Sequence, residues 1–268
     1  KEIEIPEEWE ITSLSNVSKQ IQDADHQTPK TTESGVPFLT VNDIAQNDPL
    51  DFSKASFVAE KEYFDFIKKV KPEKNDILYT RVATVGVARL LEKTEKIVVS
   101  SNAVVIKPNE LINSKFLKQF LNFEEIKSAL TSNKAGTAYS FFSLKQIKEI
   151  KIIRPPIPEQ QQIASILSNV DDTIQKTDQI IEQTQRLKKG MMQKLLTRGI
   201  GHTKFKKVKW YFGKQKEIPE EWEMKKLVEI SKIIDSLHIT PEFSSKGIPM
   251  VRSTEIKYGN LKLENAAS

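Results

Sequence analysis

Residues 155–198, PPIPEQQQIASILSNVDDTIQKTDQIIEQTQRLKKGMMQKLLTR, decide the fold that we expect of this chain. Pro158 and Glu159 suit the first turn of a helix, because the missing N–H of proline has no partner there and a carboxylate meets the positive helix end. No further proline occurs before Arg198, and Gly190 is the only glycine. The stretch therefore predicts one helix from Pro158 to Arg198, about 60 Å long at about 1.5 Å per residue.

Apolar residues recur along this helix with the four–three spacing of a coiled-coil seam. The predicted helix–helix or partner interface consists of Ile163, Leu167, Val170, Ile174, Ile181, Met191 and Leu195. Thr177, Thr184 and Lys188 also fall on the seam and weaken a tight homodimeric zipper. Two partners stay open: a matching antiparallel helix from a duplicated half, or a second copy of the chain. A solitary helix would leave the apolar stripe in water.

An internal repeat organises the rest of the chain. Ile5–Glu10, IPEEWE, recurs letter for letter as Ile218–Glu223, and further identities follow at the same offset, from Leu14 and Leu227 onward. Such self-similarity indicates a tandem duplication. We expect one complete unit and the truncated start of a second, from a natural product of about 430 residues, twice the offset.

Residues 1–154 mix short apolar runs with turn residues, which predicts an α/β domain with a mixed sheet and flanking short helices. Expected strands span 36–41, 77–80, 85–91, 97–99 and 103–107, and expected helices span 60–69, 114–122 and 144–149. Ser143 and Gln146 have the spacing of a capping box for the last helix. The expected domains are 1–154, a long helix at 155–200, a basic linker at 201–217, and the second unit at 218–268.

Composition argues against most catalytic classes. The chain has no cysteine and three scattered histidines, which excludes disulfide scaffolds, thiolate metal sites and cysteine nucleophiles. Its nine glycines form no phosphate-binding loop, and its Glu-x-Lys triplets lack the Pro-Asp partner of a nuclease site. No apolar run is long enough to span a membrane. We expect a non-catalytic, metal-free binding protein in a reducing cytoplasm.

The positive charge is local. Eleven of the 41 Lys and Arg residues lie between Arg186 and Lys216, where no Asp or Glu occurs, so the remainder of this chain of net charge +5 is acidic. Such a run is either a solvated face or a phosphate-facing strip. If the strip faces phosphates, we expect contacts to the nucleic-acid backbone from the lysines after the Gly199–His202 segment, namely Lys204, Lys206, Lys207 and Lys209.

Polar loops could supply contacts to DNA bases. The candidates lie in segments 80–86, 100–102 and 132–140, and are Arg81, Thr84, Asn102, Lys134, Thr137, Tyr139 and Ser140. Each also has a purely structural interpretation. Arg81 could pair with Asp76, Asn102 could cap a turn, and Tyr139 could pack on Phe141 and Phe142.

In combination, these strings resemble the DNA specificity subunit of type I restriction-modification systems. The resemblance rests on the IPEEWE repeat, Gly35–Leu39, Asn75–Leu78 followed by Gly86, Gly136-Thr137 ahead of Leu144–Ile147, and Pro155–Ala164. The most specific string is Leu187–His202, LKKGMMQKLLTRGIGH, which is similar to the end of that family's first central helix.

The resemblance implies two target recognition domains separated by two antiparallel helices. Each domain reads half of a split site on double-stranded DNA, and the helices set the unspecified gap and dock modification (methyltransferase) subunits. The cofactors S-adenosylmethionine, ATP and Mg are then expected on the modification and restriction (translocase/nuclease) subunits, with none bound by this chain. The truncated form could homodimerise through the long helix. The alternative from another class is a homodimeric DNA-binding transcriptional regulator.

Overall fold

The computed structural model of the chain describes residues 4–24, 29–46, 48–93, 96–132, 141–234, 248–251, 256–257 and 260–261. The chain divides into two compact units, Lys1–Gln185 and Arg186–Ser268, which are described separately below. Within the described residues, no helix is long and apolar enough to cross a membrane.

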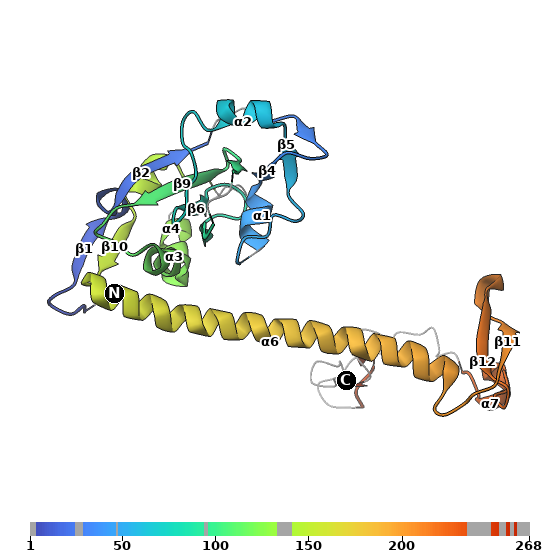
Figure 1. Cartoon of the computed structure of the whole chain (residues 1–268). Helices are drawn as coiled ribbons and strands as arrows, with labels where there is room; N and C mark the ends of the chain where they lie inside the picture. Colours follow the sequence, from blue (N-terminus) through green and yellow to red (C-terminus); the bar gives the residue numbers. More distant parts are fainter. Residues whose placement is uncertain are drawn as a thin grey trace. The chain divides into compact units, whose positions relative to one another are not determined.

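The first unit is built around a four-stranded antiparallel sheet (Figure 1). Its strand order is β2 (Ser18–Asp23), β9 (Ala103–Pro108), β6 (Ile77–Thr80) and β7 (Ala88–Leu90). All four residues of β6 are buried, because both faces of the sheet are covered. Tyr79 contributes to the core on the face that carries α3 and α5, and Leu78 to the core on the other face. The strands expected at 77–80 and 103–107 are confirmed.

A second, mixed sheet covers the Leu78 side. Its order is β3 (Thr31–Thr32), β5 (Ser56–Val58), β4 (Val36–Leu39) and β8 (Val98–Val99), with β4 and β8 parallel. The strand expected at 36–41 ends at Leu39, because Thr40 and Asp43 cap the start of α1 (Val41–Gln46). The Thr40 N–H donates to the Asp43 carboxylate at 2.8 Å, so Val41 is helical instead of extended.

Short helices pack around the sheets. They are α2 (Glu60–Phe66), α3 (Ser114–Asn122), α4 (Glu124–Ser132) and α5 (Leu144–Lys148). The bounds expected for α3 are confirmed, as is the capping box between Ser143 and Gln146. The helix expected at 60–69 ends earlier, at Phe66, and α4 had no counterpart among the expected helices. The strand expected at 85–91 is only Ala88–Leu90, because Gly86 lies at φ +81° in the turn before it.

The two ends of the first unit meet in a small antiparallel ladder of β1 (Glu10–Ser13) and β10 (Lys151–Arg154). The chain then enters α6 (Ile157–Arg198), one uninterrupted helix of 42 residues that begins in the first unit and ends in the second (Figure 1). The expected long helix is confirmed and starts one residue earlier than Pro158. Only Gln160 and Ala164 of this helix are buried.

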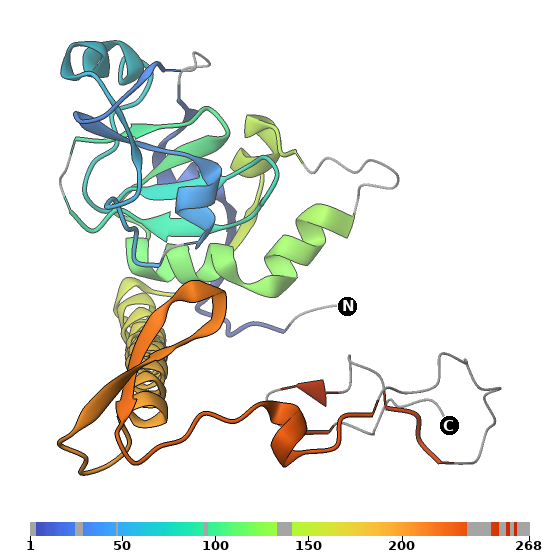
Figure 2. The ribbon, with the colours of Figure 1, turned by 90° about the vertical axis from the view of Figure 1, so that its right-hand side faces the viewer.

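In the second unit, α6 is followed by a hairpin of β11 (Phe205–Lys209) and β12 (Gln215–Pro219), seen in orange in Figure 2. The segment 201–217, which the sequence suggested as a basic linker, therefore contains β11 and the first part of β12. Tyr211–Gly213 (η2) form the turn between the strands. The one-turn helix α7 (Leu227–Ile230) and the short strands β13 (Ile256–Lys257) and β14 (Asn260–Leu261) follow.

The two copies of the repeated sequence adopt the same local structure. The N–H of Trp9 donates to the carbonyl of Pro6 at 3.0 Å, and Trp222 makes the same 3.0 Å bond to Pro219. The helical turn Leu14–Val17 (η1) corresponds to α7, which lies 213 residues later. Their surroundings differ, however. Leu14 is fully buried, whereas the equivalent Leu227 is 62% exposed.

Candidate nucleic-acid interface

Arg81 lies at the carboxyl end of β6 but does not reach the surface. Its guanidinium is 3.0 Å from the Asp23 carboxylate, donates to the Ser101 carbonyl at 3.1 Å, and stacks over the Phe141 ring at 5.2 Å. The side chain is only 8% exposed. Through these contacts Arg81 connects the segments of Asp23, Ser101 and Phe141. We therefore no longer assign it to base contact.

The sequence-based alternative, in which Arg81 pairs with Asp76, is wrong about the partner. Asp76 pairs instead with Lys107, whose Nζ lies 2.9 Å from it and 2.9 Å from Glu73. Burial raises the pKa of Asp76, and the hydrogen bond from Lys107 opposes that shift.

Thr84 and Asn102 are both exposed and belong to turns that meet at one edge of the central sheet. Antiparallel pairing sets Thr80 opposite Ala103, which places the end of β6 beside the start of β9. The Arg81 N–H donates to the Asn102 carbonyl at 3.1 Å, which joins the two turns directly. We call this edge, formed by residues 80–86 and 100–102, the recognition edge.

The segment after residue 140 also returns to the recognition edge. The Phe142 N–H donates to the Arg81 carbonyl at 2.9 Å, and Phe141 forms a β-bridge with Val82. The candidates Lys134, Thr137, Tyr139 and Ser140 lie outside the described residues. The described chain resumes at Phe141, beside Arg81 and Val82 of the recognition edge.

The lysines of the basic strip are exposed on and beside the hairpin. Lys207 and Lys209 alternate with Val208 along β11 and so share one face. The Nζ of Lys206 donates to the Glu220 carbonyl at 2.7 Å, while Lys204 precedes the strand. The hairpin thus presents rows of ammonium groups, as contact with phosphates requires.

Sequence reasoning missed the aromatic tip of this hairpin. Trp210, Tyr211 and Phe212 occupy the turn and are 37%, 71% and 100% exposed. Three consecutive aromatic residues before a glycine, within a lysine-rich segment, were the available signal.

Two of the motifs that supported the family resemblance connect the α/β domain of the first unit to α6. The indole Nε1 of Trp9 donates to the Glu159 carboxylate at 3.0 Å. Gln160, which is fully buried, accepts the Asn113 N–H at 2.7 Å and donates to the carbonyls of Pro155 and Leu111. The start of α6 is therefore held to the α/β domain by hydrogen bonds of the Trp9 and Gln160 side chains.

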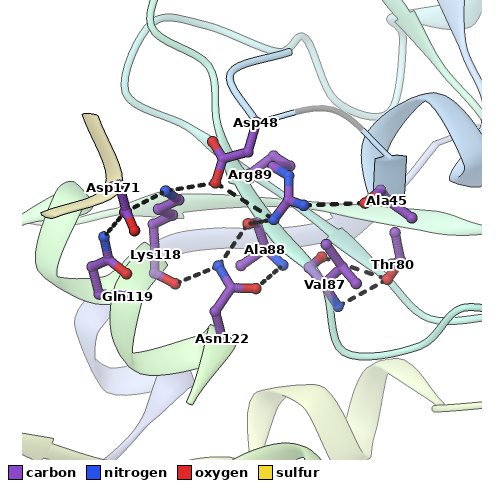
Figure 3. Close-up of polar contacts among 10 residues, drawn as sticks. All are labelled: Ala45, Asp48, Thr80, Val87, Ala88, Arg89, Lys118, Gln119, Asn122 and Asp171. Carbon is purple, nitrogen blue, oxygen red and sulfur yellow. Dashed lines mark hydrogen bonds and ion pairs between the residues drawn. The ribbon is translucent and has the colours of Figure 1, made fainter. Parts of the chain in front are cut away.

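A polar network adds a second connection at Asp171, about three turns further along the helix (Figure 3). Lys118 of α3 lies 2.8 Å from the Asp48 carboxylate and 3.5 Å from that of Asp171 on α6. Arg89 lies 3.8 Å from Asp48 on the other side. Burial lowers the pKa of Arg89, and the charges of Asp48 and Asp171 oppose this shift. The network connects the sheet, α3 and α6 through alternating charges.

The predicted seam residues on α6 fall into two groups: Ile163 and Leu167 lie beside α3, and the others are exposed. Ile163 and Leu167 line an apolar hollow of about 520 Å³ together with Phe116 and Phe120. The seam residues beyond them are exposed, namely Val170, Ile174, Ile181, Met191 and Leu195. Among the described residues, no cluster of metal-binding side chains occurs.

Comparison with known proteins identifies a family. Residues 6–186 match the type I restriction modification DNA specificity domain. The chain is 28% identical over 270 residues to the type I restriction enzyme MjaVIII specificity subunit of Methanocaldococcus jannaschii, covering 99% of this chain and 59% of the relative. It is 24% identical over 267 residues to the MjaIX specificity subunit of the same organism, covering 95% and 60%.

Among solved structures, a chain of a type I R-M system superposes with a TM-score of 0.53 at 16% identity, over 72% of this chain and 46% of that one. At this identity the likeness concerns the fold alone. The chain spans about three-fifths of the length of the curated relatives. Since the family match covers more than half of the chain, from the IPEEWE motif into α6, the chain belongs to the family of type I restriction modification DNA specificity domains.

Proposed function

We propose that the chain is a non-catalytic DNA-recognition subunit, which reads one half of a bipartite site for a type I restriction-modification complex. The family match over residues 6–186 carries this proposal, because that span contains the recognition edge and most of α6. Thr84 and Asn102 contact base edges, together with the loop that holds Lys134, Thr137, Tyr139 and Ser140. Lys204, Lys206, Lys207 and Lys209 contact phosphates. Modification and restriction subunits supply the chemistry and the cofactors.

The second part of the proposal is that α6 sets the gap between half-sites and docks the modification subunits. Its 42 residues give about 63 Å, compared with about 34 Å for one turn of B-DNA. A helix of that length separates two recognition domains by one to two turns of the duplex. Trp9, Gln160 and Lys118 support this role, since a spacer requires a rigid joint at its end.

The exposed seam of α6 needs a covering helix, because apolar side chains at heptad spacing are stabilised by burial. In the chain as given, a second copy provides that helix in antiparallel orientation. Sedimentation equilibrium tests this association. The expected result is a dimer that Ile174→Asp with Ile181→Asp dissociates, whereas a monomeric wild-type chain would contradict it.

The DNA-reading proposal is tested by selection from a pool of random duplexes, followed by affinity measurements over a salt series. Replacing Thr84 and Asn102 with alanine should change the selected bases with little effect on the salt slope. Lys207→Ala with Lys209→Ala should weaken binding equally on all duplexes and reduce the salt slope by about one per lysine. Lys145→Ala is the matched control, since its side chain is 84% exposed on α5. A pool that yields no preferred half-site would refute sequence recognition.

A further inference from the structure

The turn of the β11–β12 hairpin is ordered around its aromatic residues. The Trp210 N–H donates to the Lys214 carbonyl at 2.6 Å, and the Trp210 and Tyr211 rings meet edge to face at 5.2 Å. The Nζ of Lys216 lies 5.1 Å from the Trp210 ring centroid. These contacts fix Trp210 and direct the next two residues away from the strands. Phe212 is left fully exposed.

Phe212 is exposed at a cost to the fold. Its backbone is left-handed, at φ 56° and ψ 33°, a conformation that glycine and asparagine tolerate and bulky residues rarely adopt. A ring of this size in open water also gains nothing from burial within the chain. Neither folding nor turn geometry therefore accounts for phenylalanine at this position. Contact of its ring with another molecule would account for it.

The charges around the tip indicate what that molecule is. Lys209 and Lys214 flank the aromatic turn, and no acidic residue occurs between Arg186 and Lys216. The first carboxylate, that of Glu217, is paired with Arg198 at 3.0 Å. An apolar tip between ammonium groups matches a surface in which stacked rings lie between rows of phosphates.

We propose that this tip is an apolar wedge for duplex DNA, with Phe212 packed against a base-pair step and Lys209 and Lys214 on the adjacent phosphates. The inference rests on the proposed DNA-recognition function and adds a contact that does not read sequence. Every base presents a π-face, so stacking on Phe212 needs no particular base. The hairpin thus holds DNA of any sequence, whereas the recognition edge selects the half-site.

Phe212→Asn tests the wedge without damaging the hairpin, because asparagine tolerates the left-handed backbone. The full chain is titrated onto a labelled duplex of mixed sequence across a salt series. We expect Phe212→Asn to bind the duplex more weakly, with an unchanged salt slope and by at most about 150-fold, the upper range for loss of one aromatic–base stack, because unstacking the duplex step offsets part of that gain. Lys209→Ala should instead lower the salt slope by about one. Phe64→Ala is the matched control, since Phe64 is 63% exposed on α2, and it should bind like the wild type.

The same titrations distinguish failure of the wedge from failure of the proposed function. If the wild-type chain binds the duplex and Phe212→Asn binds equally well, the wedge is refuted and the proposed function stands. If the wild-type chain binds no duplex at all, the proposed function falls and the wedge with it. Vesicles of phosphatidylglycerol and phosphatidylcholine provide a further arm. A Phe212 effect seen on these vesicles and not on the duplex would overturn the wedge in favour of a membrane contact. Thermal unfolding should show Phe212→Asn to be at least as stable as the wild type.

Discussion

Two glycines with opposite surroundings test the fold at the residue scale. Gly35 has φ +144°, and a Cβ there would lie 2.2 Å from the Val58 carbonyl oxygen, so Gly35→Ala should lower the free energy of unfolding by more than about 1 kcal/mol. Gly190 lies in α6 with nothing within 4 Å of such a Cβ. Gly190→Ala should raise helix stability by about 0.5–1 kcal/mol. Urea unfolding monitored by circular dichroism measures both. If both substitutions changed the free energy of unfolding in the same direction, the assignment of opposite surroundings would be contradicted.

Arg81 provides the second test at this scale. Arg81→Met removes the Arg81 guanidinium from the buried Asp23 carboxylate, and breaking a buried pair in this way typically costs about 3–5 kcal/mol of unfolding free energy. The double variant Arg81→Met with Asp23→Leu removes both charges and should recover most of that loss. Chemical denaturation measures the three proteins. An Arg81→Met chain of unchanged stability that loses base discrimination would return Arg81 to the recognition surface.

At the scale of elements, the network in Figure 3 holds α3 against α6. Lys118→Met keeps the aliphatic stem and removes the charge that Asp48 and Asp171 share. Because both carboxylates are more than 40% exposed, we expect a loss of only about 1 kcal/mol.

Amide hydrogen exchange around Asp171 should accelerate in Lys118→Met, because the turn of α6 there loses the ion pair with Lys118 and keeps only the hydrogen bond from Gln119 among its described contacts to α3. Lys145→Met is the matched control, since Lys145 makes a solvent-exposed 4.0 Å pair with Glu149. If both variants exchanged at the wild-type rate around Asp171, the network would not restrain the helix.

The hairpin shows where element prediction from the sequence failed. Residues 205–219, FKKVKWYFGKQKEIP, lack a clear period of two, and their many lysines suggested a solvated segment instead of strands. The ladder between β11 and β12 pairs Lys207 with Glu217 and Val208 with Lys216. Glu217 also pairs with Arg198 at the end of α6. These cross-strand and helix contacts stabilise a segment whose local composition suggests a linker.

At the scale of the whole molecule, the ruler proposal predicts how the DNA gap responds to the length of α6. Seven residues inserted between Val170 and Thr184 preserve the heptad seam and add about 10 Å, close to three base pairs. Methylated adenines mapped in a host that expresses the chain with its modification subunits should show that wider gap with unchanged half-sites. The same insertion between Ser53 and Lys54, which are both exposed in a turn, should leave the gap unaltered. A constant gap in both strains would refute the ruler.

The sequence by itself determined the features that depend on neighbours along the chain. The length of α6, the bounds of α3 and the Ser143–Gln146 cap follow from periodicity, proline position and side chains within one turn. The repeated turns at Trp9 and Trp222 are equally local.

Only the tertiary structure decided which distant groups meet. Arg81 pairs with Asp23, 58 residues away, because the sheet order places β2, β9 and β6 side by side. Leu14 is buried and Leu227 is exposed although both follow the same motif at the same distance, since strands and helices from far along the first unit surround only Leu14. Burial and charge pairing depend on residues that are distant in the sequence and close in the fold. A local sequence pattern does not contain that information.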